Sequence, residues 1–190
     1  MRESTLKVQA GSLKGIKIPF PVSVKGNSNF TSAIVKKSIF SMLDSLEMNS
    51  RLSKSESIFI DLFSGSAQIG IEAASQGFKK ILFYEIDSNR YRDLKKFLVT
   101  MKFEYQAFHK DSFRFHSSFE KEGFDSLVYF IDPPFSFFET DSEKIIKLVN
   151  TIIEENQNSK LFILIQSPKN FSMEGFTERL LGNQKILINF

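Results

Sequence analysis

From residue 57 onward, short apolar runs alternate with longer segments whose apolar residues recur at helical spacing. The short runs are rich in Ile, Leu and Phe, which is typical of buried strands, and the longer segments predict amphipathic helices. The expected strands cover 58–63, 81–86, 105–111, 126–132 and 161–166. The expected helices cover 68–77, 88–101 with Ser88 as its cap, 113–119 and 142–156. Such alternation predicts a parallel sheet covered by helices on both faces.

The two ends of the chain follow other patterns. The tail, "FTERLLGNQKILINF", predicts two strands around Gly182 and Asn183, which would form a hairpin at one edge of the sheet. In the first 56 residues, "SLKGIKIPFP" predicts a short strand or hairpin arm, "VKGNSN" a loop, and 31–46 a helix. We therefore expect an α/β fold over 57–190, with seven mostly parallel strands and a C-terminal antiparallel hairpin. Residues 1–56 would be a small basic extension packed on this core.

The composition narrows the class of protein. The chain has 190 residues, of which 42% are hydrophobic and 25% are charged, as expected for one globular domain. It has no cysteine, which excludes disulfides and cysteine-ligated metal centres. The start, "MRESTLKVQA", lacks the apolar core of a signal peptide, and no apolar run approaches the roughly 20 residues of a membrane span. We therefore expect a cytoplasmic protein without a membrane partner.

Basic residues are concentrated in the first part of the chain. Residues 1–54 contain nine Lys or Arg and three acids, whereas residues 55–190 contain sixteen Lys or Arg and nineteen acids. This asymmetry favours a polyanionic partner, although a solvated Lys-rich surface would give the same counts. The expected nucleic-acid-binding residues are Lys7, Lys14, Lys17, Lys36 and Lys37.

Polar residues at the ends of the predicted strands are candidates for function, because ligands bind beyond the carboxyl ends of parallel strands. The first strand leads into "DLFSGSAQIG", where Asp61 precedes a turn of small residues. Such a turn can bring backbone N–H groups and a helix N-terminus to a ligand. It is neither a P-loop nor a dinucleotide fingerprint, because Ile71 stands where lysine would be needed and Ala67 where glycine would be.

Glu85 and Asp111 end the next two predicted strands. Glu85 lies about 20 residues beyond the turn, where nucleotide-binding sheets place an acid for ribose hydroxyls. Asp111 is positioned to accept from an adenine amino group. Each has a plainer alternative: Glu85 as a surface acid at a strand terminus, and Asp111 as the cap of the next helix.

The segment "VYFIDPPFSFF" interrupts a buried strand with an acid and two prolines. Proline cannot donate to a sheet ladder, and an unpaired acid is costly in a buried strand. Pro133 also restricts the backbone of Asp132, so that carbonyls freed from the ladder can point at a ligand. With Asp132 as acceptor and Phe135 as a flat face, the segment predicts a pocket for a planar group that bears an NH₂. The alternative is a strand stop beside an incidental aromatic residue.

Taken in order, the residues at these strand ends resemble those of a class I S-adenosylmethionine-dependent methyltransferase. "DPPF" resembles the [DNS]-P-P-[YFW] signature of enzymes that methylate exocyclic amines of nucleobases. "GSLKGIKIPFP", "TSAIVKKSIFSML" and "DLFSGSAQIGIEA" are similar to segments of the bacterial small-subunit ribosomal RNA guanine-N2 methyltransferases, and the resemblance extends over essentially the whole chain.

This resemblance implies a Rossmann-like sheet, S-adenosyl-L-methionine as cofactor, and methyl transfer to the N2 amine of a guanine. The implied partner is ribosomal RNA or the small ribosomal subunit, bound by a monomer that needs no metal. The implied cofactor-binding residues are Asp61, Phe63, Gly65, Ser66, Glu85 and Asp111. The implied catalytic residues, which would hold the extruded base, are Asp132, Pro133, Pro134 and Phe135.

The chain departs from that family pattern at a few positions. They are Asn29, Phe30, Ala33, Lys37, Ala67 and Gln166. Ala67 replaces the second glycine of the loop, which would cost about 1 kcal/mol if a positive φ is needed there. Two alternatives therefore stay open. One is a DNA amine methyltransferase acting on adenine N6 or cytosine N4, although such enzymes usually carry a target-recognition domain for which this chain has no room. The other is a catalytically impaired assembly factor that binds the cofactor and RNA.

Overall fold

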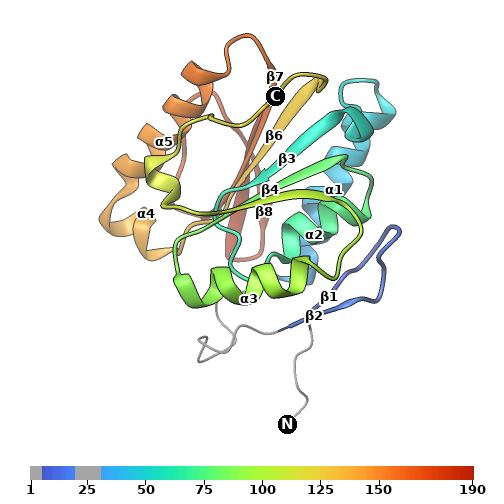
Figure 1. Ribbon diagram of the computed structural model, residues 1–190. Coiled ribbons are helices and arrows are strands. Elements are labelled where there is room, and N and C mark those ends of the chain that lie inside the picture. The colour runs from blue at the N-terminus through green and yellow to red at the C-terminus, as the bar shows by residue number, and fades with distance from the viewer. Residues whose placement is uncertain (1–5, 20–30) are drawn as a thin grey trace.

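The computed structural model describes residues 6–19 and 31–190, in which a seven-stranded sheet forms the centre (Figure 1). The sheet order is β5-β4-β3-β6-β7-β9-β8. Its parallel strands are β3 (Ser57–Asp61), β4 (Lys80–Glu85), β5 (Glu104–His109), β6 (Ser126–Ile131) and β7 (Lys160–Pro168). The antiparallel hairpin consists of β8 (Thr177–Leu181) and β9 (Gln184–Asn189). The predicted fold class is confirmed.

Helices cover both faces of this sheet, as the alternating pattern predicts (Figure 1). Helices α1 (Ala33–Met48), α2 (Gln68–Ser75) and α3 (Ser88–Leu98) pack on one face, against a core that contains Phe59 and Phe83. Helix α5 (Ser142–Glu155) packs on the other face, against a core that contains Tyr129. Strands β3, β4 and β6 are buried along their whole length, as is typical of parallel strands covered on two sides.

Two local predictions are wrong and one element was not predicted. Asp87, not Ser88, caps α3, because its carboxylate accepts hydrogen bonds from two backbone N–H groups of the first turn. Only a 3-10 turn, η3 (Ser112–Arg114), forms where a helix over 113–119 was expected. A short helix, α4 (Ser136–Thr140), begins two residues after the second proline, with Phe135 as its N-cap, so both prolines lie outside the helix and remove none of its hydrogen bonds.

The first described residues form a hairpin of β1 (Leu6–Lys7) and β2 (Lys17–Ile18) that packs on α2. The backbone N–H groups of Gln9 and Ala10 each donate to the fully buried carboxylate of Glu72 at 2.8 Å. Gly11 has φ +78°, and a Cβ there would lie 1.8 Å from the carbonyl oxygen of Ser75. Hydrogen bonds to a buried charge are stronger than ordinary ones, so Glu72 anchors the hairpin firmly.

The predicted loop 24–29 and the departures at Asn29 and Phe30 lie outside the described residues. Within the ranges 6–19 and 31–190, no helix combines the length and apolar character needed to cross a bilayer. A 3-10 helix, η2 (Lys54–Glu56), leads into β3.

Candidate active site

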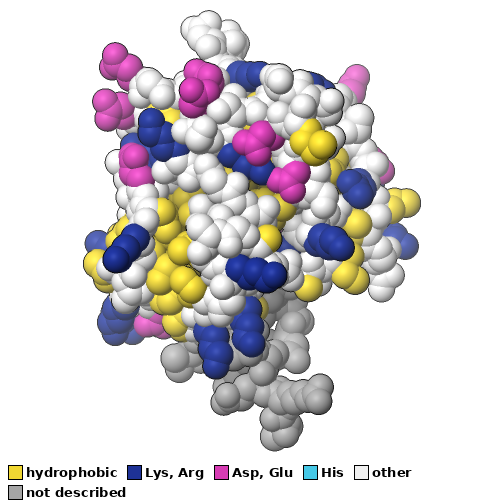
Figure 2. Space-filling view, turned by 90° about the vertical axis from the view of Figure 1, so that its right-hand side faces the viewer, with side chains coloured by type: hydrophobic (Ala, Val, Ile, Leu, Met, Phe, Trp, Pro, Cys, Tyr) yellow, Lys and Arg dark blue, Asp and Glu magenta, His cyan; other side chains and the backbone are white. Residues whose placement is uncertain are grey.

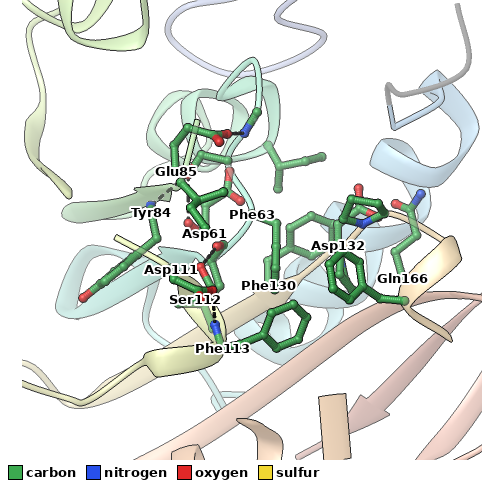
Figure 3. Close-up of a pocket in the computed structure, with 18 of the residues that line it drawn as sticks. Asp61, Phe63, Tyr84, Glu85, Asp111, Ser112, Phe113, Phe130, Asp132 and Gln166 are labelled. Atoms are coloured by element: carbon green, nitrogen blue, oxygen red, sulfur yellow. Dashed lines mark hydrogen bonds between the residues drawn. The ribbon is translucent and has the colours of Figure 1, made fainter. Parts of the chain in front are cut away.

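A cavity of about 980 Å³ opens at the carboxyl ends of the central strands (Figure 3). It lies where β3 pairs with β4 on one side and β6 on the other, the switch point at which such sheets bind ligands. The cavity is lined by every residue predicted for cofactor binding or catalysis: Asp61, Phe63, Gly65, Ser66, Glu85, Asp111, Asp132, Pro133, Pro134 and Phe135. The structure thus brings these ten residues together.

The register of the strands explains why three carboxylates line the same cavity. Asp61 at the end of β3 pairs with Phe83 of β4 and with Phe130 of β6. Glu85 and Asp132 each lie two residues beyond those partners, and side chains two apart on a strand project to the same face. Figure 3 shows Glu85 on one side of the cavity and Asp132 on the other. The cleft therefore has two separate polar ends.

Glu85 is held at one end by the loop that follows β3. Its Oε2 accepts a hydrogen bond from the N–H of Gly65 at 2.9 Å, and its Oε1 accepts one from the N–H of Asp87 at 2.8 Å. Burial raises the pKa of Glu85. Each carboxylate oxygen can accept a second hydrogen bond, so the group remains able to bind two hydroxyls.

Asp61 ties the loop to the helix that follows. Its Oδ2 accepts a hydrogen bond from the N–H of Gly70 at 3.2 Å. Burial, together with the smaller effect of the nearby charges of Asp132 and Glu85, raises the pKa of Asp61 to about 8. The loop ends at Ala67, which has φ +61° and is fully buried. The backbone therefore adopts a positive φ at this position, which is the condition under which the missing glycine carries a cost.

Asp132 marks the other end of the cavity. Thr31 donates a hydrogen bond from its Oγ1 to Asp132 Oδ2 at 3.0 Å, and burial raises the pKa of Asp132 to about 7. Pro133 is buried, whereas Phe135 is 39% exposed and contacts Phe138 edge-on at a centroid distance of 6.0 Å. The Phe135 ring thus lies at the cavity mouth, where it can stack on a planar group.

Asp111 caps the turn that follows β5, which is the plainer of its two predicted roles, and it also lines the cavity. Its Oδ1 accepts a hydrogen bond from the N–H of Phe113 at 3.0 Å, so it caps the 3-10 turn. Phe113 contacts Phe63 at 5.3 Å and Phe137 at 5.0 Å between ring centroids, which gives the cavity an aromatic wall. Neither Phe113 nor Phe137 is among the predicted site residues; the only feature of the sequence that points to them is that each closely follows an acid at the end of a predicted strand.

The five lysines predicted to bind nucleic acid differ in their exposure to solvent. Lys7, Lys14 and Lys17 are exposed on the hairpin, and Lys37 is exposed on α1. The prediction for Lys36 is corrected: its side chain is buried, its Nζ donates to the carbonyl of Lys7 at 3.2 Å, and burial lowers its pKa. Figure 2 shows Lys and Arg over both halves of one face, whereas Asp and Glu lie mainly in its upper half, away from the half that holds the hairpin in Figure 1.

Comparison with known proteins identifies the family. Residues 6–183 match the family described as Conserved hypothetical protein 95. The chain belongs to this family. It is 32% identical over 157 residues to the Bacillus subtilis protein YlbH, which carries the name of an rRNA methyltransferase, and the match covers 80% of this chain and 76% of YlbH.

Two further relatives of this family member come from Haemophilus influenzae. Ribosomal RNA small subunit methyltransferase D is 35% identical over 81 residues, which cover 41% of this chain and 42% of that protein. The crystal structure of a protein described as a methylase is 26% identical, with a TM-score of 0.67 and coverage of 97% of each chain. The predicted resemblance to class I methyltransferases of ribosomal RNA is thereby confirmed.

S-adenosylmethionine is the cofactor of this class of methyltransferase. The human METTL16 N-terminal domain in complex with SAH has the same fold at 13% identity, with a TM-score of 0.60 and coverage of 89% of this chain and 75% of that one. The residues of the cavity fit a polar ligand, because three buried polar atoms in its wall have no partner among the described residues. They are Gln68 Oε1, Arg90 Nε and Gln166 Oε1.

Proposed function

We propose that the protein transfers a methyl group from S-adenosylmethionine to the exocyclic N2 amine of a guanine in small-subunit ribosomal RNA. The observation that carries this proposal is the shared cavity, in which Glu85 lies at one end and Asp132 with Phe135 at the other. One end suits a ribose diol and the other suits a flat base with an amino group. The names of the relatives, which refer to ribosomal RNA, support the choice of substrate.

At the cofactor end, Glu85 would accept hydrogen bonds from the two ribose hydroxyls. The backbone beside Gly65 and Ser66 is open to the cavity, and a Cβ added at Gly65 would meet only one atom, 3.9 Å away. The amino-acid part of the cofactor would therefore pass close to this turn. Phe63 and Phe113 would flank the adenine, with Asp111 as an acceptor for its amino group.

At the substrate end, the chemistry depends on a poor nucleophile, since the lone pair of an aryl amine is delocalised into the ring. Asp132 and the Pro133 carbonyl would accept the two N–H hydrogens and favour a pyramidal nitrogen. The bound cofactor supplies an electrophilic methyl group on sulfur. Asp132 would hold the amine in line with that methyl group, so that the N–C bond forms as the C–S bond breaks and the demethylated cofactor leaves; alignment of this kind accounts for much of the rate gain.

The proton of the methylated amine needs no strong base, because the amine is acidic once the new bond has formed. Asp132, with a pKa raised to about 7, can take this proton and release it to solvent. Phe135 would stack on the extruded base. The exposed lysines of the hairpin would bind RNA phosphates, an interaction that weakens with salt.

The proposal is tested by radiolabelled methyl transfer to undermethylated small ribosomal subunits and to the RNA extracted from them. We expect wild type to label one guanine as N2-methylguanosine, identified by nucleoside analysis, and Asp132→Ala to reduce labelling at least 100-fold. Asp125→Ala is the matched control, because Asp125 is exposed at the opposite end of β6. Equal labelling by Asp132→Ala and wild type would remove Asp132 from the mechanism.

The two alternatives give different results in the same experiment. A DNA amine methyltransferase would label adenine N6 or cytosine N4 in DNA and leave the ribosomal RNA unlabelled. An impaired assembly factor would bind S-adenosylmethionine in calorimetry without labelling any substrate. Either result would overturn the proposed reaction.

A further inference from the structure

The end of β7 carries a polar side chain that the proposed mechanism does not use. Gln166 follows Ile165, which pairs with Ile131 of β6, so Gln166 and Asp132 occupy equivalent positions on neighbouring parallel strands. Such strands lie about 4.8 Å apart, and residues in register project to the same face. Figure 3 shows Gln166 beside Asp132, on the opposite side of the cavity from Glu85. Gln166 thus lies next to the predicted amine site.

Gln166 is only 5% exposed, yet its Oε1 has no hydrogen-bond partner in the described part of the chain. Its Nε2 donates to Gln184 Oε1 at 3.0 Å. Gln184 lies on β9, two residues before Ile186, which pairs with Gln166, so both glutamines project to one face and both line the cavity. An unsatisfied buried acceptor is costly, which indicates that a ligand group completes it.

We propose that Gln166 reads the N1–H of the target guanine and that Gln184 sets the orientation of its amide. This inference rests on the proposed function and names how the base is selected. In guanine, the ring nitrogen N1 lies between the carbon that carries the amine and the carbon that carries the carbonyl, and it is an N–H donor. In adenine and cytosine, the ring nitrogen beside the amine is instead an acceptor. Gln166 Oε1 and Asp132 therefore present two adjacent acceptors to two adjacent donors of guanine.

The contact with Gln184 decides which base the site accepts. Because Gln184 Oε1 accepts from Gln166 Nε2, the oxygen of the Gln166 amide is left for the ligand. If the amide turned over, an NH₂ would face the base and would suit the ring acceptors of adenine or cytosine. Gln184 is thus a positioning residue, and Gln166 is a base-reading residue.

The test compares two RNAs that differ only at the guanine labelled in the previous experiment. One RNA carries guanine and the other carries 2-aminopurine, which keeps the N2 amine but has hydrogen in place of the O6 carbonyl and a ring-nitrogen acceptor in place of N1–H. We expect wild type to favour guanine about 10- to 100-fold in kcat/KM, the usual effect of one unpaired buried polar group. Gln166→Met removes the acceptor and should abolish most of this preference, whereas Gln166→Glu keeps an acceptor and should retain it.

The role of Gln184 has its own pair of variants. Gln184→Leu leaves the Gln166 amide free to turn and should reduce the preference for guanine, and Gln184→Glu keeps the orienting acceptor and should restore it. Thermal unfolding of each variant verifies that it is folded. A preference that stays the same in Gln166→Met, or a wild type that methylates both RNAs equally, would overturn the inference while leaving the proposed function intact. Failure of wild type to methylate any guanine would instead overturn the proposed function.

Discussion

At the scale of single residues, two carboxyl groups in the cleft, that of buried Asp61 and that of half-buried Asp132, have raised pKa values. Asp132 has a pKa raised to about 7 and Asp61 one raised to about 8, in both cases mainly because burial disfavours the charged form. Thr31 opposes this shift at Asp132 by donating a hydrogen bond to the carboxylate. A group with a pKa near neutral can accept a hydrogen bond and a proton under the same conditions.

This shift predicts the pH dependence of methyl transfer. Only ionised Asp132 presents two acceptor oxygens, so kcat/KM should rise with pH through about 7 and then level off. Asp132→Asn keeps one acceptor but cannot titrate, so it should lower kcat/KM about 10- to 100-fold and remove this rise. The measurement is initial rates between pH 5.5 and 8.5 at saturating cofactor. The same rise in the asparagine variant would assign the titration to another group.

The site residues of the cavity that the sequence predicts are those at or directly after the end of an apolar strand. Asp61, Glu85 and Asp132 each end a strongly apolar strand, and a parallel sheet brings such ends to one edge. Thr31 and Phe113 could not be found in this way, because a loop or turn carries them and their position depends on tertiary packing. Lys36 was misjudged for the same reason: charge alone does not reveal that a lysine on α1 points inward.

At the scale of elements, periodicity located the strands and longer helices to within a few residues, but packing decided the short ones. The segment 113–119 is rich in Phe and suggested a helix. Its aromatic residues instead reach into the core, where Phe115 contacts Tyr84 and Tyr129 edge-on. Phe115 therefore has an extended backbone, and only one 3-10 turn forms. Such a choice between core packing and helix formation is not visible in local spacing.

The close packing of α2 on the sheet leads to a prediction for Gly70→Ala, a substitution for which helix propensity and core packing have opposite effects on stability. Alanine is the better helix former by about 1 kcal/mol. However, a Cβ at Gly70 would lie 2.2 Å from the ring of Phe83, and overpacking of a core typically costs about 1–3 kcal/mol. We expect packing to dominate, so that Gly70→Ala lowers the free energy of unfolding by about 1–2 kcal/mol in urea denaturation.

A double-mutant cycle separates this contact from a general effect on the helix. Phe83→Leu creates space beside Gly70, so Gly70→Ala should cost less in that background than in wild type. Strictly additive effects of the two substitutions would show that the Phe83 ring is not the cause. The sequence offers no hint of this contact, because it depends on the distance between α2 and β4.

At the scale of the whole molecule, the hairpin and the cleft are joined through α2. Glu72 on α2 holds the backbone of Gln9 and Ala10, and the same helix follows the loop that contacts Glu85. The lysine-bearing hairpin is therefore fixed relative to the end of the cavity that holds Glu85. Under the proposed function, phosphate contacts on the hairpin would position an RNA whose extruded base enters the other end of the cavity.

The hairpin lysines should therefore control the salt dependence of RNA binding. Each phosphate contact contributes about 0.7–0.9 to the slope of log K against log salt concentration. Replacing Lys7, Lys14 and Lys17 together by Gln should reduce that slope by about 2 and weaken binding at low salt, as measured by fluorescence anisotropy with small-subunit ribosomal RNA. The matched control replaces Lys79, Lys102 and Lys160, which are exposed near the amino ends of β4, β5 and β7, on the edge of the sheet opposite the cavity. Both variants lose the same net charge, so a similar change in slope in each would show that RNA binding follows overall charge and not the hairpin.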